Sequence, residues 1–391
     1  MLRLLHTADV HLGARYADLG PQAIAQHERQ FAAFRASIDL ALEEHVDLFL
    51  IAGDLFDSNT QPRRSAEKVA AELKRLADAR IRTVIAPGTH DVYDRSSVYR
   101  AYDLVTMAGQ PRDTELITIL TPDRSEVALP SIDAVVFGRV FGTKRAPQSP
   151  LAGFDVSGET RATWKIGVLH AAVLIPGVVE RDEVLITPDE IAASGLDYLA
   201  LGHWHSATSA RSGAVRYAYS GAPEPIALDQ DAAGKVLLVT LDVQEGKRRI
   251  DVEERQVGRT HFQRLDVDAA TIRSQAALIE QLLERRDPDL VVDVRLTGVR
   301  PDELDVDPDE VEAGLAGGFL RARVRDRSVP ALTSGPLPSP DTIAGAFIRD
   351  LEGRIAELEA TGNDEATNHA AELRDSLRVG RLLLGGHEVV L

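Results

Sequence analysis

Residues 2–13 read LRLLHTADVHLG and residues 46–54 read VDLFLIAGD, and these two stretches decide the fold class. In both, a short apolar run is followed at once by a polar turn, as in a strand buried on both faces. The run at 81–86 repeats the pattern. Residues 24–44 and 65–79 have apolar side chains every three or four positions, which predicts two helices. Strands alternating with helices through short loops predict an α/β fold.

Further apolar runs lie at residues 134–140, 166–169, 196–201 and 235–243. Fewer helical segments lie between these runs than between the apolar runs at 2–5, 46–51 and 81–86. This spacing indicates either that the sheet becomes mixed or that a second sheet packs on the first.

Beyond residue 247 the pattern is that of a smaller α/β domain. Its expected elements are a strand at 261–267, a helix at 269–285, a strand at 290–296, a helix at 308–316 and a strand at 319–327. The segment VPALTSGPLPSP contains four prolines and is expected to be a linker. After it, Asp341 is expected to cap the first of two closing helices, with an apolar stripe at Ile343, Phe347, Leu351, Ile355 and Leu358. The expected domains are therefore 1–247, 248–328, a linker at 329–340, and a helical segment at 341–391.

Composition excludes several classes of protein. The 391 residues predict two or three domains, and the absence of cysteine excludes a disulfide framework, a thiolate zinc site and a cysteine nucleophile. The first residues lack a basic leader pattern, and no run of about 18 apolar residues occurs, so we expect a cytoplasmic protein without a membrane span. The formal charge of −17 should repel nucleic acid, so any polyanionic substrate must be held by metals, local arginines or a partner.

Five short motifs lie where predicted strands end. They are Asp9-Val10-His11, Gly53-Asp54, Gly88-Thr89-His90-Asp91, His170, and Gly202-His203-Trp204-His205. Ligand sites of α/β folds lie at the carboxyl ends of the strands, where side chains from distant positions meet. Asp-x-His and His-x-His spacings place two ligands on one side of an extended segment, about 6.6 Å apart.

Carboxylate oxygen and imidazole nitrogen together suit manganese, iron or zinc. The two expected ligand sets share Asp54: Asp9, His11 and His205 for one ion, and His170 and His203 for the other. Two ions about 4 Å apart clamp a phosphoryl group and activate a water molecule for attack. His90 is close enough to stabilise the reacting phosphorus or to protonate the leaving oxygen.

Any one of these histidines alone is more often a hydrogen-bonded structural residue. Five of the eleven histidines, however, lie at predicted strand ends beside a glycine or an acid. The other six are interpreted as structural: His6, His27, His45, His261, His369 and His387.

The order of these motifs resembles that of the calcineurin-like metallophosphoesterase superfamily. Within it, LHTADVHLG, LIAGDLFD, LALGHWH and YSGAPEP resemble SbcD-type DNA exonucleases of double-strand-break repair. The resemblance covers residues 1–245 well and the rest only in layout. It implies an α/β fold in which a two-sheet sandwich is flanked by helices, with a small α/β capping domain that touches DNA and a C-terminal helix pair.

The resemblance also implies site roles. The first metal would take Asp9, His11, Asp54 and His205, the second Asp54, His170 and His203, and His90 would be the transition-state histidine. The ions would be two divalent cations, with Mn²⁺ expected and Mg²⁺, Fe²⁺ or Zn²⁺ as alternatives. The chain departs from the family at Thr89, where an asparagine amide normally binds the second ion. We expect weaker occupancy of that site, unless a water molecule bridges the hydroxyl to the ion.

Asp57 and Asp91 are expected to support the ligands rather than to bind an ion. For Asp57, a turn residue that caps the following helix is an equal alternative.

In RARVRDR, Arg321, Arg323, Arg325 and Arg327 alternate with other residues, so a strand would place four guanidinium groups on one face about 6.6 Å apart. Such a row could contact DNA phosphates. The competing interpretation is an edge strand paired with the acid-rich segment 302–312.

The terminal helix pair suits docking to another protein, which in this family is an SMC-like coiled-coil ATPase of the SbcC type; folding back onto its own domain is an equal alternative. Related nucleases also form homodimers.

Three functions are therefore considered. The first is a metal-dependent DNA exonuclease and endonuclease that acts on DNA ends and single strands in repair, together with the ATPase. The second is a phosphodiesterase or phosphatase acting on small nucleotides. The third is a DNA-end-binding scaffold protein whose metal site is weakened by Thr89.

Overall fold

The computed structural model describes residues 1–16, 23–158, 160–225, 230, 232–301, 304–330, 338–361 and 364–384. Most of the expected linker, as well as Asp302 and His387, lies outside these residues. The chain divides into two compact units, Met1–His261 and Phe262–Leu391, and each is described by itself.

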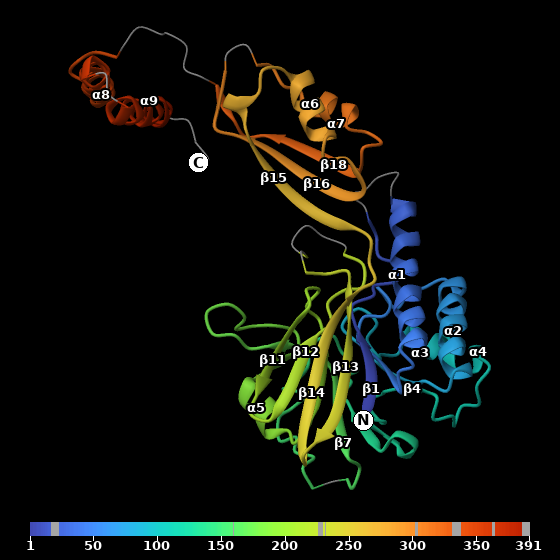
Figure 1. Cartoon of the computed structure of the whole chain (residues 1–391). Coiled ribbons are helices and arrows are strands. Elements are labelled where there is room, and N and C mark those ends of the chain that lie inside the picture. Colours follow the sequence, from blue (N-terminus) through green and yellow to red (C-terminus); the bar gives the residue numbers. More distant parts are fainter. Residues whose placement is uncertain are drawn as a thin grey trace. The chain divides into compact units, whose positions relative to one another are not determined.

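The first unit contains two six-stranded sheets (Figure 1). The first sheet has the order β14-β13-β1-β2-β3-β4. Strands β1 to β4 run parallel to one another. At one edge β13 pairs antiparallel with β1, and β14 pairs antiparallel with β13. The strands are β1 (Leu2–Thr7), β2 (Leu48–Ala52), β3 (Arg82–Ala86), β4 (Ile117–Ile119), β13 (Lys235–Gln244) and β14 (Lys247–Gln256).

The second sheet has the order β11-β12-β10-β7-β6-β5. Its central strands β12, β10, β7 and β6 run parallel, and its edge strands β11 and β5 are antiparallel to their neighbours. The strands are β5 (Glu126–Leu129), β6 (Ala134–Phe137), β7 (Trp164–His170), β10 (Tyr198–Gly202), β11 (Thr208–Ser212) and β12 (Val215–Tyr219). A short pair, β8 (Ala172–Val173) and β9 (Leu185–Ile186), follows β7.

The two sheets pack face to face through one apolar core, to which Leu4 and Leu50 contribute from the first sheet and Ile166 and Val168 from the second. Two helices cover the other face of the first sheet, α1 (Ala23–Glu43) and α2 (Arg63–Asp78), and α5 (Pro188–Ala193) packs on the second. The remaining short helices are α3 (Val98–Ala101), α4 (Leu104–Met107) and η2 (Pro130–Ile132). The expected two-sheet α/β sandwich flanked by helices is confirmed.

The first unit extends past the expected boundary at residue 247. Strand β14 pairs with β13 in unbroken register from Lys247 to Gln256, so it belongs to the first sheet. The charged sequence of β14 concealed this strand, because an edge strand with one solvated face needs few apolar residues.

The first part of the second unit is a three-stranded sheet with two helices. The sheet has the order β15-β16-β18, formed by β15 (His261–Asp268), β16 (Asp287–Thr297) and β18 (Phe319–Asp326). The helices are α6 (Gln275–Leu283) and α7 (Pro308–Gly314); the minor elements are η3 (Ala269–Thr271), β17 (Val299–Arg300) and β19 (Val329–Pro330). The expected helix at 269–285 begins late, because Ser274 accepts a hydrogen bond from the Ala277 amide and starts α6 there.

The closing helices are α8 (Ile343–Thr361) and α9 (Asp364–Leu384), which pack against each other. They approach closely where Gly380 faces the ring of Phe347, since a Cβ at Gly380 would lie 2.2 Å from that ring. Thr342 rather than Asp341 caps α8, because its Oγ1 accepts the Gly345 amide. Ile343, expected in the apolar stripe, is 82% exposed.

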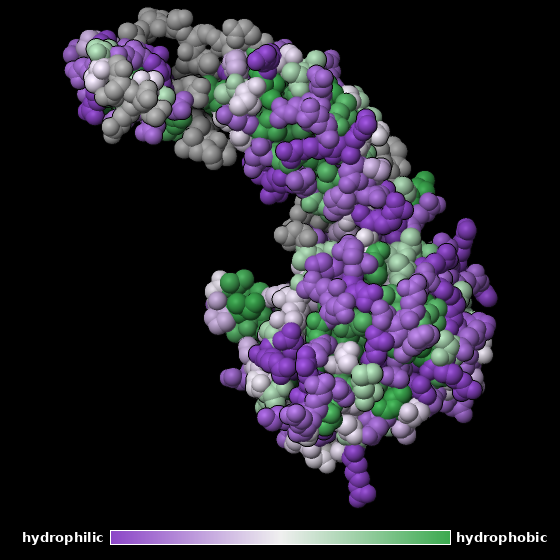
Figure 2. All heavy atoms as spheres, in the orientation of Figure 1, coloured by the Kyte–Doolittle hydropathy of each residue, from purple (hydrophilic) through white to green (hydrophobic). Residues whose placement is uncertain are grey.

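Hydrophilic residues are spread over the face drawn in Figure 2, with apolar residues scattered among them. Among the described residues, no helix has the length and apolar character needed to cross a membrane.

Candidate metal centre

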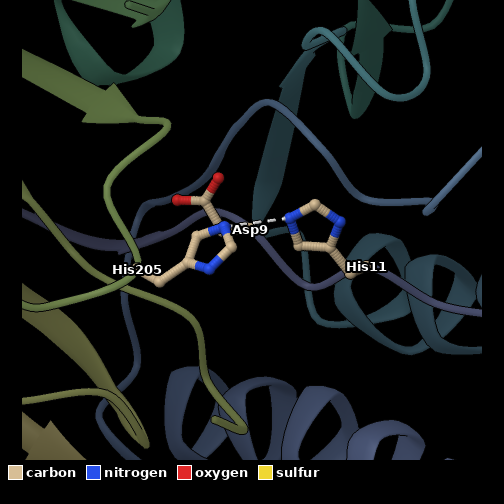
Figure 3. Close-up of side chains that lie close together, drawn as sticks. All are labelled: Asp9, His11 and His205. Carbon is tan, nitrogen blue, oxygen red and sulfur yellow. Dashed lines mark hydrogen bonds between the residues drawn. The ribbon is translucent and has the colours of Figure 1, made fainter. Parts of the chain in front are cut away.

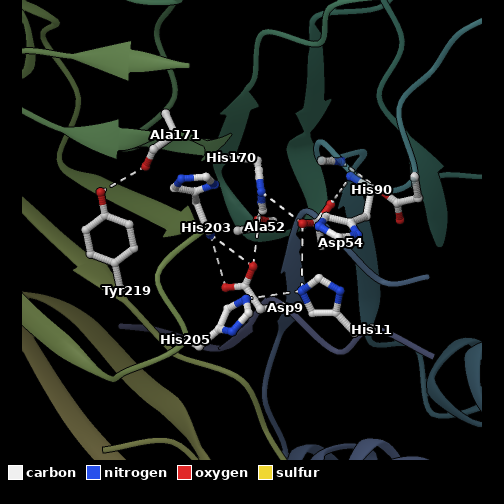
Figure 4. Close-up of polar contacts among 12 residues, drawn as sticks. Asp9, His11, Ala52, Asp54, His90, His170, Ala171, His203, His205 and Tyr219 are labelled. Atoms are coloured by element: carbon white, nitrogen blue, oxygen red, sulfur yellow. Dashed lines mark hydrogen bonds and ion pairs between the residues drawn. The ribbon is translucent and has the colours of Figure 1, made fainter. Parts of the chain in front are cut away.

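The five motifs meet at the carboxyl ends of parallel strands β1, β2, β3, β7 and β10 (Figure 4). Two backbone hydrogen bonds hold the loops after β1 and β2 together: the Asp9 amide donates to the Gly53 carbonyl (3.1 Å) and the His11 amide to the Asp54 carbonyl (2.9 Å). The loops are therefore fixed by the sheet behind them and by each other.

Four of the site residues have left-handed backbone conformations. The φ angles are +52° at Asp9, +50° at His11, +50° at Asp54 and +106° at His203. Side-chain-bearing residues adopt this region rarely, and each instance costs about 1–3 kcal/mol. Such strain is typical of functional sites, where it sets the direction of a side chain.

Glycines leave the space that the site residues occupy. A Cβ at Gly53 would lie 2.2 Å from His170 Nδ1, and a Cβ at Gly88 would lie 2.3 Å from Asp54 Oδ1. Glycine is therefore required at Gly88 for steric reasons, and at Gly53 both for steric reasons and because its φ is +93°.

Asp9, His11 and His205 form one group of possible metal ligands (Figure 3). Each offers one ligand atom, and these atoms lie within 4.8 Å of one another. The Nε2 atoms of His11 and His205 are 3.2 Å apart. The backbone amide of His203 donates to both carboxylate oxygens of Asp9, at 3.0 and 3.1 Å, and so orients it.

Asp9, Asp54 and His170 form a second group, in which all three side chains are buried. His170 Nδ1 donates a hydrogen bond to the Ala52 carbonyl (3.1 Å), while its Nε2 lies 3.1 Å from Asp54 Oδ2. The carbonyl can only accept, so Nδ1 carries a proton, and Nε2 is the nitrogen directed at the Asp54 carboxylate. Nε2 is therefore the atom that would bind a metal, once the proton it shares with Asp54 is displaced.

His203, expected to share the second ion with His170, makes a different contact. Its Nε2 lies 2.9 Å from Asp182 Oδ2, and its ring centroid lies 5.2 Å from that of His170. Within the described residues, His203 is in none of the groups that could hold an ion. If His203 binds a metal, it does so through Nδ1, with Asp182 fixing the ring.

His11, Asp57 and His90 form a third group beside the first. Asp57 Oδ1 lies 3.3 Å from His11 Nδ1. The backbone amide of His90 donates to Asp54 Oδ1 (2.7 Å), and its Nδ1 donates to the Asp57 carbonyl (3.0 Å). The last hydrogen bond leaves His90 Nε2 free to act on a bound group. Asp57 does not cap α2, whose first turn follows Pro62 without a side-chain cap.

Asp91 lies beneath the loop that carries His90. It is fully buried and accepts hydrogen bonds from the Gly88 amide (2.7 Å), the Phe56 amide (3.2 Å) and the Tyr99 hydroxyl (2.6 Å). Burial raises the pKa of Asp91. Thr89, also buried, lies in the same loop, so Asp91 fixes the position of both Thr89 and His90.

The electrostatics of the centre favour a cation. Burial raises the pKa of Asp9 to about 7. Burial acts to lower the pKa of His170, but the adjacent Asp54 and Asp9 carboxylates outweigh it and raise that pKa to about 10. Burial lowers the pKa of His205 to about 3. Asp9 and His170 thus hold protons that a divalent cation would displace. Burial acts to raise the pKa of Asp54, but the neighbouring histidines outweigh it, lower that pKa and keep Asp54 ionised. Carboxylate and imidazole donors fit manganese, iron or zinc.

Asp182 is the residue that the sequence did not identify. It lies between β8 and β9, outside every motif, and reaches His203 only because that loop folds back over the strand ends. An acid beside a ligand histidine is a recurrent arrangement, but it leaves no spacing signal along the chain.

In the second unit, Arg321, Arg323 and Arg325 lie on one face of β18, the edge strand, and Arg327 follows the end of that strand. The expected row is therefore three residues in the strand and one beyond it. The edge interpretation also holds in part, since Glu312 accepts a hydrogen bond from the Val324 amide (2.7 Å).

The same face carries a buried acid among arginines. Asp293 is 1% exposed, and its carboxylate lies 3.4 Å from Arg325 Nε, 3.4 Å from Arg264 Nε and 3.5 Å from Arg295 Nε. One carboxylate faces three guanidinium groups here, and Arg323 adds a further exposed positive charge to the same face.

The chain is similar to known phosphoesterases over its first unit. The model of the calcineurin-like phosphoesterase family matches residues 2–207. The chain is 28% identical over 210 residues to the uncharacterized metallophosphoesterase YhaO of Bacillus subtilis, which covers 52% of this chain and 48% of that protein.

Other relatives are named for DNA repair or nuclease activity, and they include the following two. The DNA double-strand break repair protein Mre11 of Aeropyrum pernix is 28% identical over 278 residues, covering 68% of this chain and 64% of that protein. The SbcD component of the nuclease SbcCD of Rhodobacter capsulatus is 28% identical over 265 residues, covering 59% and 64%. The chain thus spans about half to two thirds of the length of these relatives. The resemblance to SbcD-type proteins is confirmed, and the chain belongs to the calcineurin-like phosphoesterase family.

Proposed function

We propose that this protein is a metal-dependent DNA nuclease that hydrolyses phosphodiester bonds in DNA repair. One observation carries the proposal: Asp9, His11, Asp54, His170 and His205 converge at the carboxyl ends of strands from both sheets, with their ligand atoms close to one another (Figure 4). The names of the Mre11 and SbcCD relatives support DNA as the substrate.

In this proposal the two ligand groups hold two divalent cations, with manganese as the expected ion and magnesium, iron or zinc as alternatives. Thr89 and His203 complete the second site. When bound, two such cations offset the charge of a phosphoryl group and supply an activated nucleophile.

His90 has the proton-transfer role. Its Nδ1 is tied to the Asp57 carbonyl, which presents the other nitrogen to the substrate side. The side chain is 47% exposed, so a phosphoryl group can reach it. Asp57 and Asp91 act through their neighbours: Asp57 positions His11, and Asp91 holds the loop of Thr89 and His90.

We also propose that the face of Arg321, Arg323 and Arg325, with Arg327 beyond it, contacts DNA phosphates. A positive face on a separate unit favours DNA over a small nucleotide, because phosphate contacts along a backbone supply affinity without sequence preference. Helices α8 and α9 are the proposed docking segment for an SMC-like coiled-coil ATPase, and a homodimer is the proposed assembly of the first unit.

The test is release of nucleotides from linear duplex DNA in the presence of manganese. We expect activity from the unaltered chain and at least about 10³-fold less from Asp54→Asn. Asp9 is the member common to the two ligand groups, but Asp54 Oδ2 lies 3.1 Å from His170 Nε2 and 3.8 Å from His11 Nε2, so loss of its charge removes electrostatic stabilisation from both. Asp123→Asn, at an exposed aspartate of the same unit, is the matched control and should retain activity. Equal activity of Asp54→Asn and the unaltered chain would contradict the proposal.

A further inference from the structure

A cavity of about 500 Å³ lies beside the candidate metal centre. Six of the residues that line it carry the argument: Arg15, Gln30, Phe31, Asp57, Gln61 and Lys68. We propose that this cavity binds the terminal nucleotide of a DNA strand next to the phosphodiester bond to be cleaved. The inference rests on the proposed nuclease function. It adds that the nucleotide at the end of the DNA strand is the part of the substrate that occupies this cavity.

The cavity and the metal centre share their walls. Asp57 lines the cavity and lies 3.3 Å from His11 Nδ1. The Asp57 amide donates to the Leu12 carbonyl (3.1 Å), and Leu12 lines the cavity as well. A group bound in the cavity would therefore contact Asp57 and Leu12, which are next to His11, a ligand of the first ion.

The charge of the cavity is opposite to that of the chain. Arg15 and Lys68 are cationic, and Asp57 is the one acid among the described residues that line it. Lys68 Nζ lies 4.8 Å from the ring centroid of Phe31, which keeps the ammonium group against the cavity wall. In a chain of net charge −17, two cations in one small cavity indicate an anionic ligand such as a phosphate group.

Gln30 supplies an independent observation. This side chain is 1% exposed, and its Nε2 has no hydrogen-bond partner among the described residues. An unpaired buried amide is destabilising, and a hydrogen-bond acceptor on a ligand would offset that cost. The Gln61 amide is held in place by a hydrogen bond from its Nε2 to the Ser58 carbonyl (3.1 Å).

These groups together match a nucleotide better than a free anion. Glutamine amides pair with the edges of nucleobases, and lysine or arginine pairs with phosphate. A volume of about 500 Å³ lies within the range of small-molecule sites. A base that enters the cavity must leave the duplex stack, which costs a few kcal/mol and is easiest at a strand end.

The test is equilibrium binding of thymidine 5′-monophosphate to the full chain in EDTA, so that no metal contributes. We expect saturable binding that is tighter than that of thymidine or inorganic phosphate alone. Lys68→Gln and Gln30→Leu should each weaken it about tenfold, as expected for losing a hydrogen bond to a charged or buried group. Lys74→Gln, on the same helix α2 and paired with Asp78, is the matched control and should bind like the unaltered chain.

Equal binding by Lys68→Gln, Gln30→Leu and Lys74→Gln would overturn the proposal, and so would binding of phosphate as tight as that of the nucleotide. Thermal unfolding checks that each variant is folded. If Gln30→Leu does not fold, Lys68→Gln alone tests the proposal, because Lys68 is exposed and its replacement should not affect folding.

A second measurement separates this inference from the nuclease function. With manganese, Lys68→Gln should raise KM for DNA ends and leave hydrolysis of bis(4-nitrophenyl) phosphate unchanged, because that substrate lacks a nucleotide. DNA cleavage without nucleotide binding would contradict the proposed role of the cavity but not the nuclease function. Nucleotide binding without DNA cleavage would contradict the nuclease function alone.

Discussion

The Asp57 carboxylate lies 3.3 Å from Nδ1 of His11, which leaves Nε2 of the same ring facing His205 at 3.2 Å. The contact with Asp57 raises the pKa of His11 against the effect of burial and fixes the orientation of the ring. A ligand histidine held this way is ready to bind an ion before the ion arrives.

Replacing Asp57 by asparagine should therefore weaken manganese binding about 10- to 100-fold, the usual cost of losing a partner of a ligand histidine. Calorimetric titration with manganese measures it, and Asp123→Asn is again the control. Unchanged affinity in Asp57→Asn would show that the contact does not position His11.

Gly53→Ala should disturb the centre by steric conflict. The new Cβ would lie 2.2 Å from His170 Nδ1 at a residue with φ of +93°, so we expect a loss of about 2–4 kcal/mol in the free energy of unfolding and weaker metal binding. Gly109→Ala is the matched control, because its φ is +75° and nothing lies within 4 Å of its new Cβ. It should lose about 1 kcal/mol and bind metal normally. If both variants lost the same stability and kept metal affinity, Gly53 would have no role in the centre.

Thr89→Asn should strengthen the second metal site. An amide oxygen reaches further than a hydroxyl, so we expect the second manganese to bind about tenfold more tightly, as for one added ligand contact, and hydrolysis to need less manganese. Thr89→Ser, which keeps the hydroxyl, should behave like the unaltered chain. Two tightly bound ions per unaltered chain would refute the expectation of a weakened site.

Buried His6 should make stability depend on pH. It lies on β1, and its Nδ1 is hydrogen-bonded to the Tyr198 hydroxyl (2.9 Å). Burial lowers its pKa to about 3. Below the ordinary histidine pKa of about 6.5, His6 binds a proton in the unfolded chain but stays neutral in the folded chain. The free energy of unfolding therefore falls with decreasing pH until about pH 3, below which His6 is protonated in both states.

The comparison is the free energy of unfolding of the unaltered chain minus that of His6→Gln, measured by urea denaturation. This difference should decrease by about 1.4 kcal/mol for each pH unit below about 6. A difference that stays constant with pH would mean that His6 titrates alike in the folded and unfolded chains.

Much of the site could be predicted because its residues follow strands. Apolar runs located the ends of β1, β2, β3, β7 and β10. Parallel pairing brings the ends together within each sheet, and the packing of the two sheets brings the two sets together. The place of His170 at a strand end could be predicted from position alone. Its hydrogen bond from Nδ1 could not, because the Ala52 carbonyl that accepts it belongs to β2 of the other sheet.

Other features depended on contacts that leave no periodic signal. Asp182 reaches His203 through a loop fold, and Asp293 gathers Arg264, Arg295 and Arg325 across three strands. The extent of the first unit was underestimated because charged β14 pairs through its backbone, which residue type hardly restricts at an edge.

The most direct test is anomalous diffraction from a crystal soaked with manganese. Ions are expected within the groups formed by Asp9, His11 and His205 and by Asp9, Asp54 and His170, and their signal should disappear in Asp54→Asn together with DNA cleavage. Manganese bound only elsewhere, or cleavage that persists when these positions are empty, would contradict the account.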